Sequence, residues 1–448
     1  MSDNGLALAE WALDEAKKKG ASAAEVLFIS AESMQTGVRF GEVEKLKSSR
    51  ERRLGLRAFC GQSSATSSTA EIERDSLLDF IAHTVELARL TAPDPWSGLP
   101  DPALQARSYP DLHLNSPDGI IDASTALDLA RRAEKAALGF DPRIKNSEGA
   151  EFDSGLYRVV FANSQGFAGE YSGTSYSLSA VPVAQDDSGM QIGYWYTSNR
   201  MFDKLDDPDS IGTTAAKRAL RRLGARKIKT TRAPVVFDPQ MAASLVSSLA
   251  GAASGTSLYK GASYLIGQLG KSVASQNVTI IDDGTIPGGL GSKPFDGEGL
   301  PTHRNAIVEK GELKTYLLDT YSARKLKMKP TGNASRSVGA PPGVGATNLY
   351  LEPGRYTPEQ IIKSVKKGLY VTELIGFGVN MVTGDYSRGA GGLWIEDGEL
   401  THPVQEITIA GNLKEVFASI EMVGNDLVWR ASVVSPTIKI SEMTIAGE

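Results

Sequence analysis

Apolar positions near the N-terminus change from a helical period to a strand period. Apolar residues recur every three or four positions before Gly20 and predict an amphipathic helix: Leu6, Ala9, Leu13 and Ala16. Short strand-like segments follow, separated by polar or turn residues such as Gly41: 25–31, 35–40, 43–48 and 53–60. The pattern predicts an antiparallel meander with the helix on one face.

The pattern then alternates between helices and strands as far as residue 230. A second helix is predicted within 77–90, a proline-rich connection over 92–110 and a third helix over 123–138. Alternating strands follow over 156–196, with a turn at Gln165-Gly166. A helix over about 211–223 runs into a basic stretch at 221–232, where we place a domain boundary.

The second half begins with a strand at 234–237 and a helix that extends to about Ala253. Asp238 is the predicted N-cap of this helix and Pro239 its first residue. Hairpin turns are predicted at Lys310-Gly311 and Asp397-Gly398. Further helix starts are predicted at Thr357-Pro358 and at Asn412, with Glu415 spaced as in a capping box, and a strand at 437–445.

Together these patterns predict an α+β protein of two domains, 1–230 and 231–448. Each domain is expected to contain an antiparallel sheet with packed helices, and the second to be rich in β-hairpins. A chain of 448 residues is longer than one hydrophobic core usually serves, which agrees with two domains.

Charge and cysteine content narrow the functional classes. The formal net charge of -5 provides no general attraction to a phosphate backbone, so we expect no nucleic-acid partner. Cys60 is the only cysteine, which rules out an intrachain disulfide and favours a reducing compartment. No apolar run reaches a membrane-spanning length, so the sequence predicts a cytoplasmic protein without a membrane partner.

Side chains that usually carry hydrolytic chemistry are scattered. The four histidines stand too far apart for any two to share a helix face: His83, His113, His303 and His402. His303 is expected in a surface loop. The acidic pairs at 186–187, 206–207 and 282–283 lie among turn-forming residues, and we interpret them as solvated turns. No catalytic residue is predicted from these patterns.

Several segments of the second half carry a family resemblance. They are Phe-Asp-Gly-Glu-Gly-Leu-Pro (295–301), Tyr-Ser-Ala-Arg-Lys-Leu (321–326), Thr-Gly-Asn (331–333), Gly-Phe-Gly-Val-Asn (376–380), Thr-Gly-Asp-Tyr-Ser-Arg-Gly-Ala (383–390), Ile-Ala-Gly-Asn-Leu (409–413) and Met-Val-Gly-Asn-Asp (422–426). In this order and spacing the chain resembles the TldD/TldE family of metallopeptidases, and most closely its TldE (PmbA) branch. The resemblance is strong from about Pro234 onward and weaker, though collinear, over 20–99.

The resemblance implies a zinc-binding helix of pattern His-Glu-x-x-x-His in the TldD-type member, with a later Cys as third ligand. In this chain Ser247 stands at the first His, Ser248 at the Glu and Ala252 at the second His, and no Cys lies in 431–434. A serine hydroxyl is a poor zinc ligand beside imidazole or thiolate, and alanine has no lone pair to offer. We therefore expect no metal or other cofactor bound by this chain and zinc in a partner.

The glycine-rich segment 376–392 is the candidate for substrate contact. Its glycines allow close backbone approach, and its polar side chains are the predicted substrate-binding residues: Asn380, Asp385, Tyr386, Ser387 and Arg388. The hypothesis is that this loop lines a cleft for an extended peptide, which pairs through its main chain with a strand edge.

The sequence leaves three functions open. The first is a subunit that builds the substrate chamber and interface of a cytosolic peptidase, with a TldD-like metallopeptidase subunit performing the hydrolysis of unfolded or flexible peptides. The second is a homodimeric or larger homo-oligomeric protein that binds or scaffolds peptides without cleaving them. The third is an autonomous hydrolase that uses other residues.

Overall fold

The computed structural model describes residues 4–448 and confirms the α+β class: helices cover antiparallel sheet in the first half and surround smaller sheets in the second. The first sheet uses strands from residues 23–199 and the remaining sheets use strands from 231–446. Within residues 4–448, no helix combines the length and apolar character needed to cross a bilayer.

The first half is built on one seven-stranded antiparallel sheet of order β3-β2-β1-β4-β5-β6, in which β7 also pairs with β5. Its strands are β1 (Ala23–Arg39), β2 (Glu42–Cys60), β3 (Ser63–Thr69), β4 (Ile144–Asn163), β5 (Ala168–Asp186), β6 (Gly189–Ile192) and β7 (Trp195–Asn199). The predicted turns are confirmed, since Phe40 and Gly41 have positive φ angles of 51° and 79°, and Gly166 one of 98°.

The strands are longer than the hydrophobic pattern predicts. The breaks expected at 32–34 and 49–52 do not occur, because β1 stays in register with both β2 and β4 through its polar middle. β4 begins at Ile144, earlier than the expected 156, and the serine- and threonine-rich β3 was not predicted. In these stretches backbone pairing continues where side-chain polarity indicated a break.

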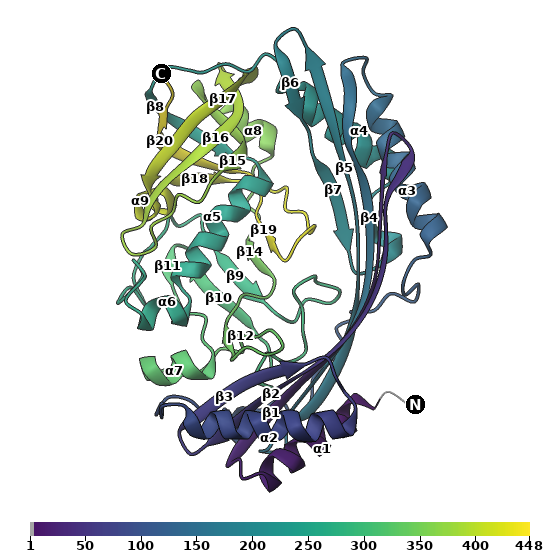
Figure 1. The fold of residues 1–448 in the computed structure, drawn as a ribbon. Helices are drawn as coiled ribbons and strands as arrows, with labels where there is room; N and C mark the ends of the chain where they lie inside the picture. The colour runs from purple at the N-terminus through teal and green to yellow at the C-terminus, as the bar shows by residue number, and fades with distance from the viewer. Residues whose placement is uncertain (1–3) are drawn as a thin grey trace.

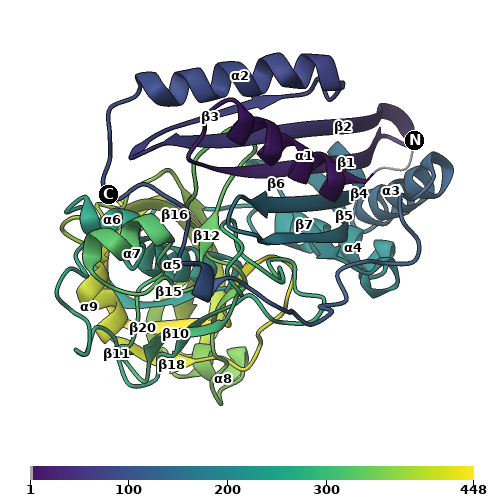
Figure 2. The same ribbon diagram turned by 90° about the horizontal axis from the view of Figure 1, so that it is seen from below.

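Four helices cover the convex face of this sheet: α1 (Gly5–Lys18), α2 (Arg74–Leu90), α3 (Ala123–Leu138) and α4 (Pro208–Leu220). Figure 2 shows α1 and α2 over the first strands and α3 and α4 over β4 and β5. α3 matches its predicted range, whereas α4 begins and ends earlier than expected. Asp207 caps α4 by accepting the Asp209 N–H, and Pro208 occupies the first turn, where no N–H is needed.

The helices α3 and α4 approach each other very closely. A Cβ at Gly212 would lie 2.0 Å from the Ala133 carbonyl oxygen, so only glycine fits at this crossing. Small side chains on the buried side of α3 also allow this close approach: Ala126, Ala130, Ala133 and Ala137.

The second half contains a sheet that closes on itself. Its order is β17-β16-β15-β8-β20-β18, and β17 also pairs with β20. Its strands are β8 (Thr231–Phe237), β15 (Lys367–Ile375), β16 (Asp385–Glu396), β17 (Glu399–Asn412), β18 (Ile420–Val423) and β20 (Ile438–Ala446). The hairpin turn at Asp397-Gly398, with positive φ at both residues, is confirmed between β16 and β17.

A second mixed sheet of order β11-β10-β9-β14-β19 and a two-stranded ribbon complete this half. The strands are β9 (Ile280–Asp283), β10 (Arg304–Glu309), β11 (Glu312–Leu313), β12 (Ala334–Ser335), β13 (Gly343–Val344), β14 (Leu349–Leu351) and β19 (Val433–Val434). The turn at Lys310-Gly311 is confirmed between β10 and β11.

Two strand pairs of the second half run parallel. β8 pairs parallel with β15, and β14 pairs parallel with β19. In both cases a long connection separates the two strands in sequence, as a parallel crossover requires.

Helices and short 3₁₀ turns fill the remaining connections. They are α5 (Pro239–Ala252), α6 (Gly255–Tyr259), α7 (Thr320–Leu326), α8 (Pro358–Lys363), α9 (Leu413–Ala418), η1 (Pro102–Leu104) and η2 (Phe202–Lys204). The predicted caps Asp238 and Thr357 accept backbone N–H groups as expected. Asn412 caps α9 by accepting the Lys414 N–H, and its side-chain amide donates to Thr383 O and Asp385 Oδ1.

One of the three acidic pairs contradicts the expectation of a solvated turn. Asp186 ends β5 and Asp187 begins the turn that follows it, and Asp207 is a helix cap, but Asp282 and Asp283 end the buried strand β9. Asp282 accepts hydrogen bonds from the Asn333 amide and the Thr347 N–H, and burial raises its pKa to about 6. Its partners are remote in sequence, so only the tertiary fold reveals the burial.

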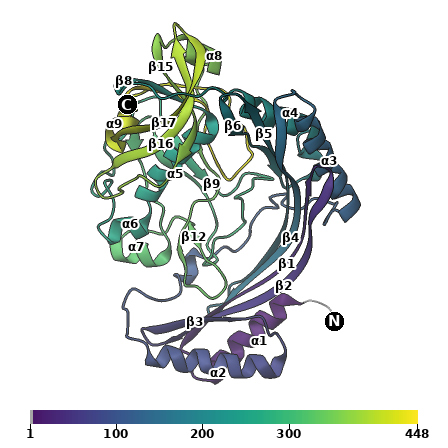
Figure 3. The same cartoon turned by 45° about the horizontal axis from the view of Figure 1, so that its top comes forward.

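The large sheet curves around the second half of the chain, which occupies its concave side (Figures 1 and 3). Arg200, directly after β7, joins the two halves: its Nε donates to Gly289 O at 2.9 Å and its Nη2 to Leu290 O at 2.8 Å. The curvature leaves part of the concave face uncovered, and this part holds the candidate site.

Candidate functional site

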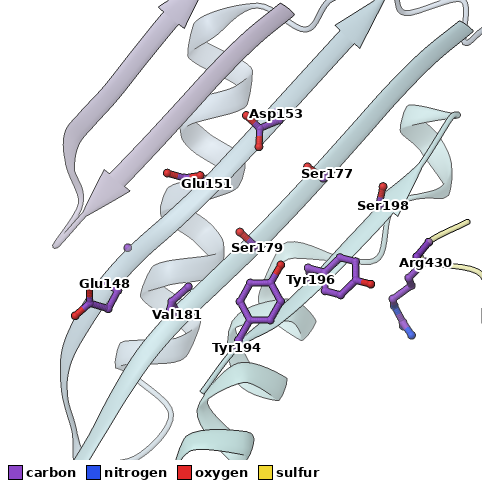
Figure 4. Close-up of a pocket in the computed structure, with 12 residues that line it drawn as sticks. Glu148, Glu151, Asp153, Ser177, Ser179, Val181, Tyr194, Tyr196, Ser198 and Arg430 are labelled. Carbon is purple, nitrogen blue, oxygen red and sulfur yellow. The ribbon is translucent and has the colours of Figure 1, made fainter. Parts of the chain in front are cut away.

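A groove separates the concave face of the large sheet from the second half of the chain. Its central pocket has a volume of about 540 Å³ and is lined by β4, β5, β7 and the loop that carries Arg430 (Figure 4). A pocket of about 270 Å³ continues it toward β1, sharing Asp153, Ser177 and Ser198 with it. A pocket of about 480 Å³ continues it toward the start of α5, sharing Tyr194, Tyr196 and Arg430.

Strand alternation explains why this wall is polar. Successive side chains of a strand point to opposite faces, and on β4 and β5 the residues Phe152, Tyr176 and Leu178 point under α3 and α4. The intervening side chains face the groove in cross-strand rows, one of which is Gln35–Asp153–Ser177–Ser198 and the next Glu151–Ser179–Tyr196. The wall therefore offers hydroxyl, carboxylate and phenol groups.

The wall is also acidic. Glu148, Glu151 and Asp153 line it, and the Lys45 ammonium lies 3.5 Å from each carboxylate oxygen of Glu151. Burial raises the pKa of Asp153, whose Oδ1 is buried with no hydrogen-bond partner among the described residues. A charged or hydrogen-bonding ligand could supply the missing donor.

Two arginine side chains pack against Trp195 where the groove extends toward α5. The Trp195 ring lies 4.8 Å from the Arg218 guanidinium and 5.0 Å from that of Arg430. Arg430 also pairs with Asp206 at 2.8 Å, and Arg218 contacts Asp238 at 3.3 Å. These contacts join the Arg430 loop and the start of α5 to the first half of the chain.

α5 carries the positions where the resemblance places a zinc motif. Ser247 is exposed, the Ser248 hydroxyl donates to the Ser244 carbonyl at 2.9 Å, and Ala252 is fully buried in the core. This set of side chains does not suit zinc, which takes imidazole, thiolate or carboxylate ligands. Among residues 4–448, no group of three or more His, Cys, Asp or Glu side chains is placed to hold a metal ion.

The predicted substrate loop lies beside α5. A Cβ at Gly251 would lie 2.9 Å from Met381 Cε, and the Tyr264 N–H donates to Met381 O. The tertiary fold thus brings the loop next to the helix positions 247–252, although more than a hundred residues separate them. The three groove pockets are lined by other residues.

Much of the polar capacity of this loop serves its own turn. The Asn380 side-chain oxygen accepts the Val382 and Thr383 N–H groups, and Asp385 accepts from Thr383 Oγ1 at 2.6 Å and Asn412 Nδ2 at 3.0 Å. These hydrogen bonds lower the pKa of Asp385. Ser387 is exposed, and Arg388 is half-buried, with no hydrogen-bond partner for its buried Nε within residues 4–448.

Tyr386 requires a correction. Its side chain is 2% exposed and packs into the hydrophobic core of the second half, where burial raises its pKa to about 12. Tyr386 and the exposed Ser387 are neighbours on β16, and successive side chains of a strand point to opposite faces. The Tyr386 phenol therefore points away from the loop surface. Substrate contact stays a prediction for Asn380, Asp385, Ser387 and Arg388.

The groove residues were not among the sequence-based candidates. The available signal was the run of serines two residues apart on β5, Ser175, Ser177 and Ser179, which indicates a polar strand face. Sequence alone could not show that the strand Trp195–Asn199 and the Arg430 loop lie beside these serines. His303 is exposed in a loop, as expected.

Comparison with known proteins identifies the family. Three domain models match in succession: PmbA/TldA metallopeptidase domain 1 (24–88), the central domain (117–223) and the C-terminal domain (230–447). The chain is 38% identical to Metalloprotease PmbA of Escherichia coli O157:H7 over 425 residues, which is 95% of this chain and 92% of that protein. The chain belongs to the PmbA/TldD family of metallopeptidases.

Two solved structures share the whole fold of this chain. A putative modulator of DNA gyrase from Bacteroides thetaiotaomicron superposes with a TM-score of 0.93 at 31% identity and covers 100% of both chains. TldE from Thermococcus kodakarensis superposes with a TM-score of 0.88 at 22% identity, covering 98% of this chain and 100% of TldE. The first two family domains lie on a single sheet in this chain, because β1 pairs with β4.

Proposed function

We propose that this PmbA-like chain is the non-catalytic subunit of a two-component zinc peptidase of the cytoplasm. A TldD-like subunit would bind the zinc and hydrolyse unfolded or flexible peptides. The observation that carries the proposal is the set Ser247, Ser248 and Ala252, which offers neither zinc ligands nor a carboxylate base at the helix where the resemblance implies them.

The role left for this chain is to build one wall of the substrate chamber. The groove has the right form, because an extended peptide could hydrogen-bond with the hydroxyls and carboxylates of β4, β5 and β7. Confining a flexible peptide in one orientation removes part of the entropy cost of reaching the reactive geometry. Side chains such as Ser177 and Ser198 suit contacts that do not depend on one particular sequence.

The decisive experiment measures zinc content and peptide hydrolysis for three samples: this chain, a TldD-like subunit and their mixture. We expect zinc with the TldD-like subunit only and full hydrolysis in the mixture only. Metal analysis by atomic emission and cleavage of an unstructured peptide, with and without a chelator, provide the readouts. Chelator-resistant cleavage by this chain alone would instead identify an autonomous hydrolase.

The oligomeric state distinguishes the remaining alternative. A homo-oligomer that captures peptides and never associates with a TldD-like subunit in size-exclusion chromatography would identify a peptide-binding or scaffolding protein. A complex that contains both chains would agree with the proposed subunit role.

The loop beside α5 provides a further prediction. Replacing Asp385 and Arg388 by alanine, with Tyr386 left intact, is expected to weaken peptide capture by the two-chain complex about 5- to 150-fold, because each of the two lost hydrogen bonds contributes about 0.5–1.5 kcal/mol. Fluorescence anisotropy with a labelled, uncleaved peptide measures the affinity. Glu399→Gln, at the exposed opposite end of β17, is the matched control. Unchanged affinity in a folded variant would remove this loop from the binding surface.

A further inference from the structure

A second, smaller pocket lies on the same concave face as the groove. We call it the aromatic pocket. It has a volume of about 250 Å³ and lies between β1, β4 and β5 on one side and the segments 293–297 and 335–336 on the other. Val159, in its lining, stands four positions along β4 from Gly155, which lines the neighbouring end of the groove. The aromatic pocket is therefore a separate site on a shared wall.

Most of the lining is apolar. The apolar side chains come from three strands and one loop: Leu27, Ile29, Val159, Phe161, Tyr171 and Phe295. The Tyr171 and Phe295 rings meet edge to face at a centroid distance of 5.3 Å. Such rings provide a rigid apolar enclosure for a hydrocarbon or aromatic group.

Arg336 gives this pocket a specific polar group. Its side chain is 2% exposed, and its Nη1 donates to Glu25 Oε1 at 2.7 Å. Its Nε and Nη2 are buried and have no hydrogen-bond partner among the described residues. These two nitrogens form the edge of a guanidinium that takes a carboxylate through two parallel hydrogen bonds.

The nearby charges leave this edge available. The Glu25 carboxylate accepts hydrogen bonds from both Arg336 and Arg57, the latter at 3.4 Å, so it is shared between two guanidinium groups. Asp296, the one acidic side chain of the lining, already accepts the Glu298, Leu300 and Ala334 N–H groups.

Lys293 adds a second cation to the lining. Its Nζ donates to Ala334 O at 3.1 Å, which is one acceptor for an ammonium that has three N–H donors. Burial lowers the pKa of Lys293, so an arriving anion would stabilise its charged form.

We infer that the aromatic pocket binds a carboxylate attached close to an apolar or aromatic side chain, with Arg336 holding the carboxylate and the strand side chains enclosing the apolar group. The volume is slightly below the 300–1,000 Å³ typical of drug-sized ligands, which fits one residue and its carboxylate better than a longer peptide segment.

Two sources carry this chemistry: the C-terminal residue of a peptide and a free apolar or aromatic acid. The position on the wall of the groove favours a peptide C-terminus, a step that rests on the proposed function. The binding chemistry itself does not depend on a partner subunit, so it is measured with this full-length chain alone.

The test compares acids with their amides by calorimetric titration. The probes are N-acetyl-L-phenylalanine and a flexible pentapeptide that ends in phenylalanine, each with a free carboxylate and as the C-terminal amide. We expect each bound acid to bind at least tenfold more tightly than its amide. Binding of the pentapeptide acid assigns the site to peptide C-termini, and binding of N-acetyl-L-phenylalanine alone assigns it to free acids. Equal affinity of acid and amide, or no binding of either acid, overturns the inference.

Two variants place the binding in this pocket. Arg336→Lys keeps the charge but cannot form the two parallel bonds, and it is expected to weaken the acid at least tenfold while leaving the amide unchanged. Val159→Phe fills the apolar space without touching an ion pair and is expected to abolish binding. Val43→Phe, the same change at an exposed position on β2 that lines neither the groove nor the aromatic pocket, is the matched control and should bind like the unaltered chain. Unchanged binding by a folded Val159→Phe protein would also overturn the inference.

Discussion

Replacing Arg200 by leucine is expected to lower the free energy of unfolding by about 3–5 kcal/mol, because several buried acceptors lose their donor at a cost of about 1–3 kcal/mol each. The Arg200 side chain is 3% exposed overall and donates to Gly289 O, Leu290 O, Thr174 O and the Tyr157 hydroxyl. Leucine would leave these acceptors buried without a donor. Denaturant unfolding followed by fluorescence and by circular dichroism measures the loss.

The location of Arg200 adds a second readout. Because its bonds to Gly289 and Leu290 connect the large sheet to the second half, we expect the variant to unfold in two separated calorimetric transitions. Lys204→Leu, an equally apolar change of an exposed cation in η2, is the control and should stay within about 0.5 kcal/mol. A loss below 1 kcal/mol for Arg200→Leu would show that Arg200 does not hold the halves together.

Glu298→Gln is expected to stabilise the protein in alkaline solution. The Glu298 side chain is buried and accepts the Thr320 N–H at 2.8 Å. Burial, and then the charge of Asp296, raise the pKa of Glu298 to about 8 from an ordinary 4.5. The folded state therefore holds a proton that the unfolded state releases, and stability falls as the pH rises from about 4.5 to about 8.

Glutamine keeps the shape and the acceptor but cannot ionise. We therefore expect the difference in free energy of unfolding, variant minus unaltered chain, to rise by about 2–4 kcal/mol between pH 5 and pH 9. Linkage sets the upper limit of this rise at roughly 1.4 kcal/mol for each unit by which the pKa differs between the folded and unfolded states. Denaturant titrations at a series of pH values measure this difference. Glu399→Gln, at an exposed position, should show no such dependence. A difference independent of pH would mean that Glu298 ionises as freely in the folded protein as in the unfolded one.

Elements with strong local signals were predicted correctly. The range predicted for α3, 123–138, matches the helix in the structure, and the start of α5 follows from Asp238 and Pro239. Turns that need positive φ, such as Lys310-Gly311, were also visible. In each case the determining interactions lie within a few residues along the chain.

The errors share one physical cause, which is pairing between residues remote in sequence. β1 continues through its polar middle because β2 and β4 supply hydrogen bonds on both sides. Asp282 is buried rather than solvated because Asn333 and Thr347 satisfy its carboxylate. Tyr386 was grouped with the loop side chains, although strand alternation turns it into the core.

The sequence by itself determined the family resemblance, the α+β class and the chemical nature of the side chains on α5, because these depend on residue identity and local order. The helix at Ser247 to Ala252 has no zinc ligands whatever the fold around it. Only the tertiary structure decided which polar residues face a common space. The groove joins Asp153, Ser177 and Arg430, and the aromatic pocket joins Leu27 to Arg336, because a long sheet curves around the second half of the chain. That curvature results from many contacts between residues that are distant in sequence, so no local sequence pattern predicts it.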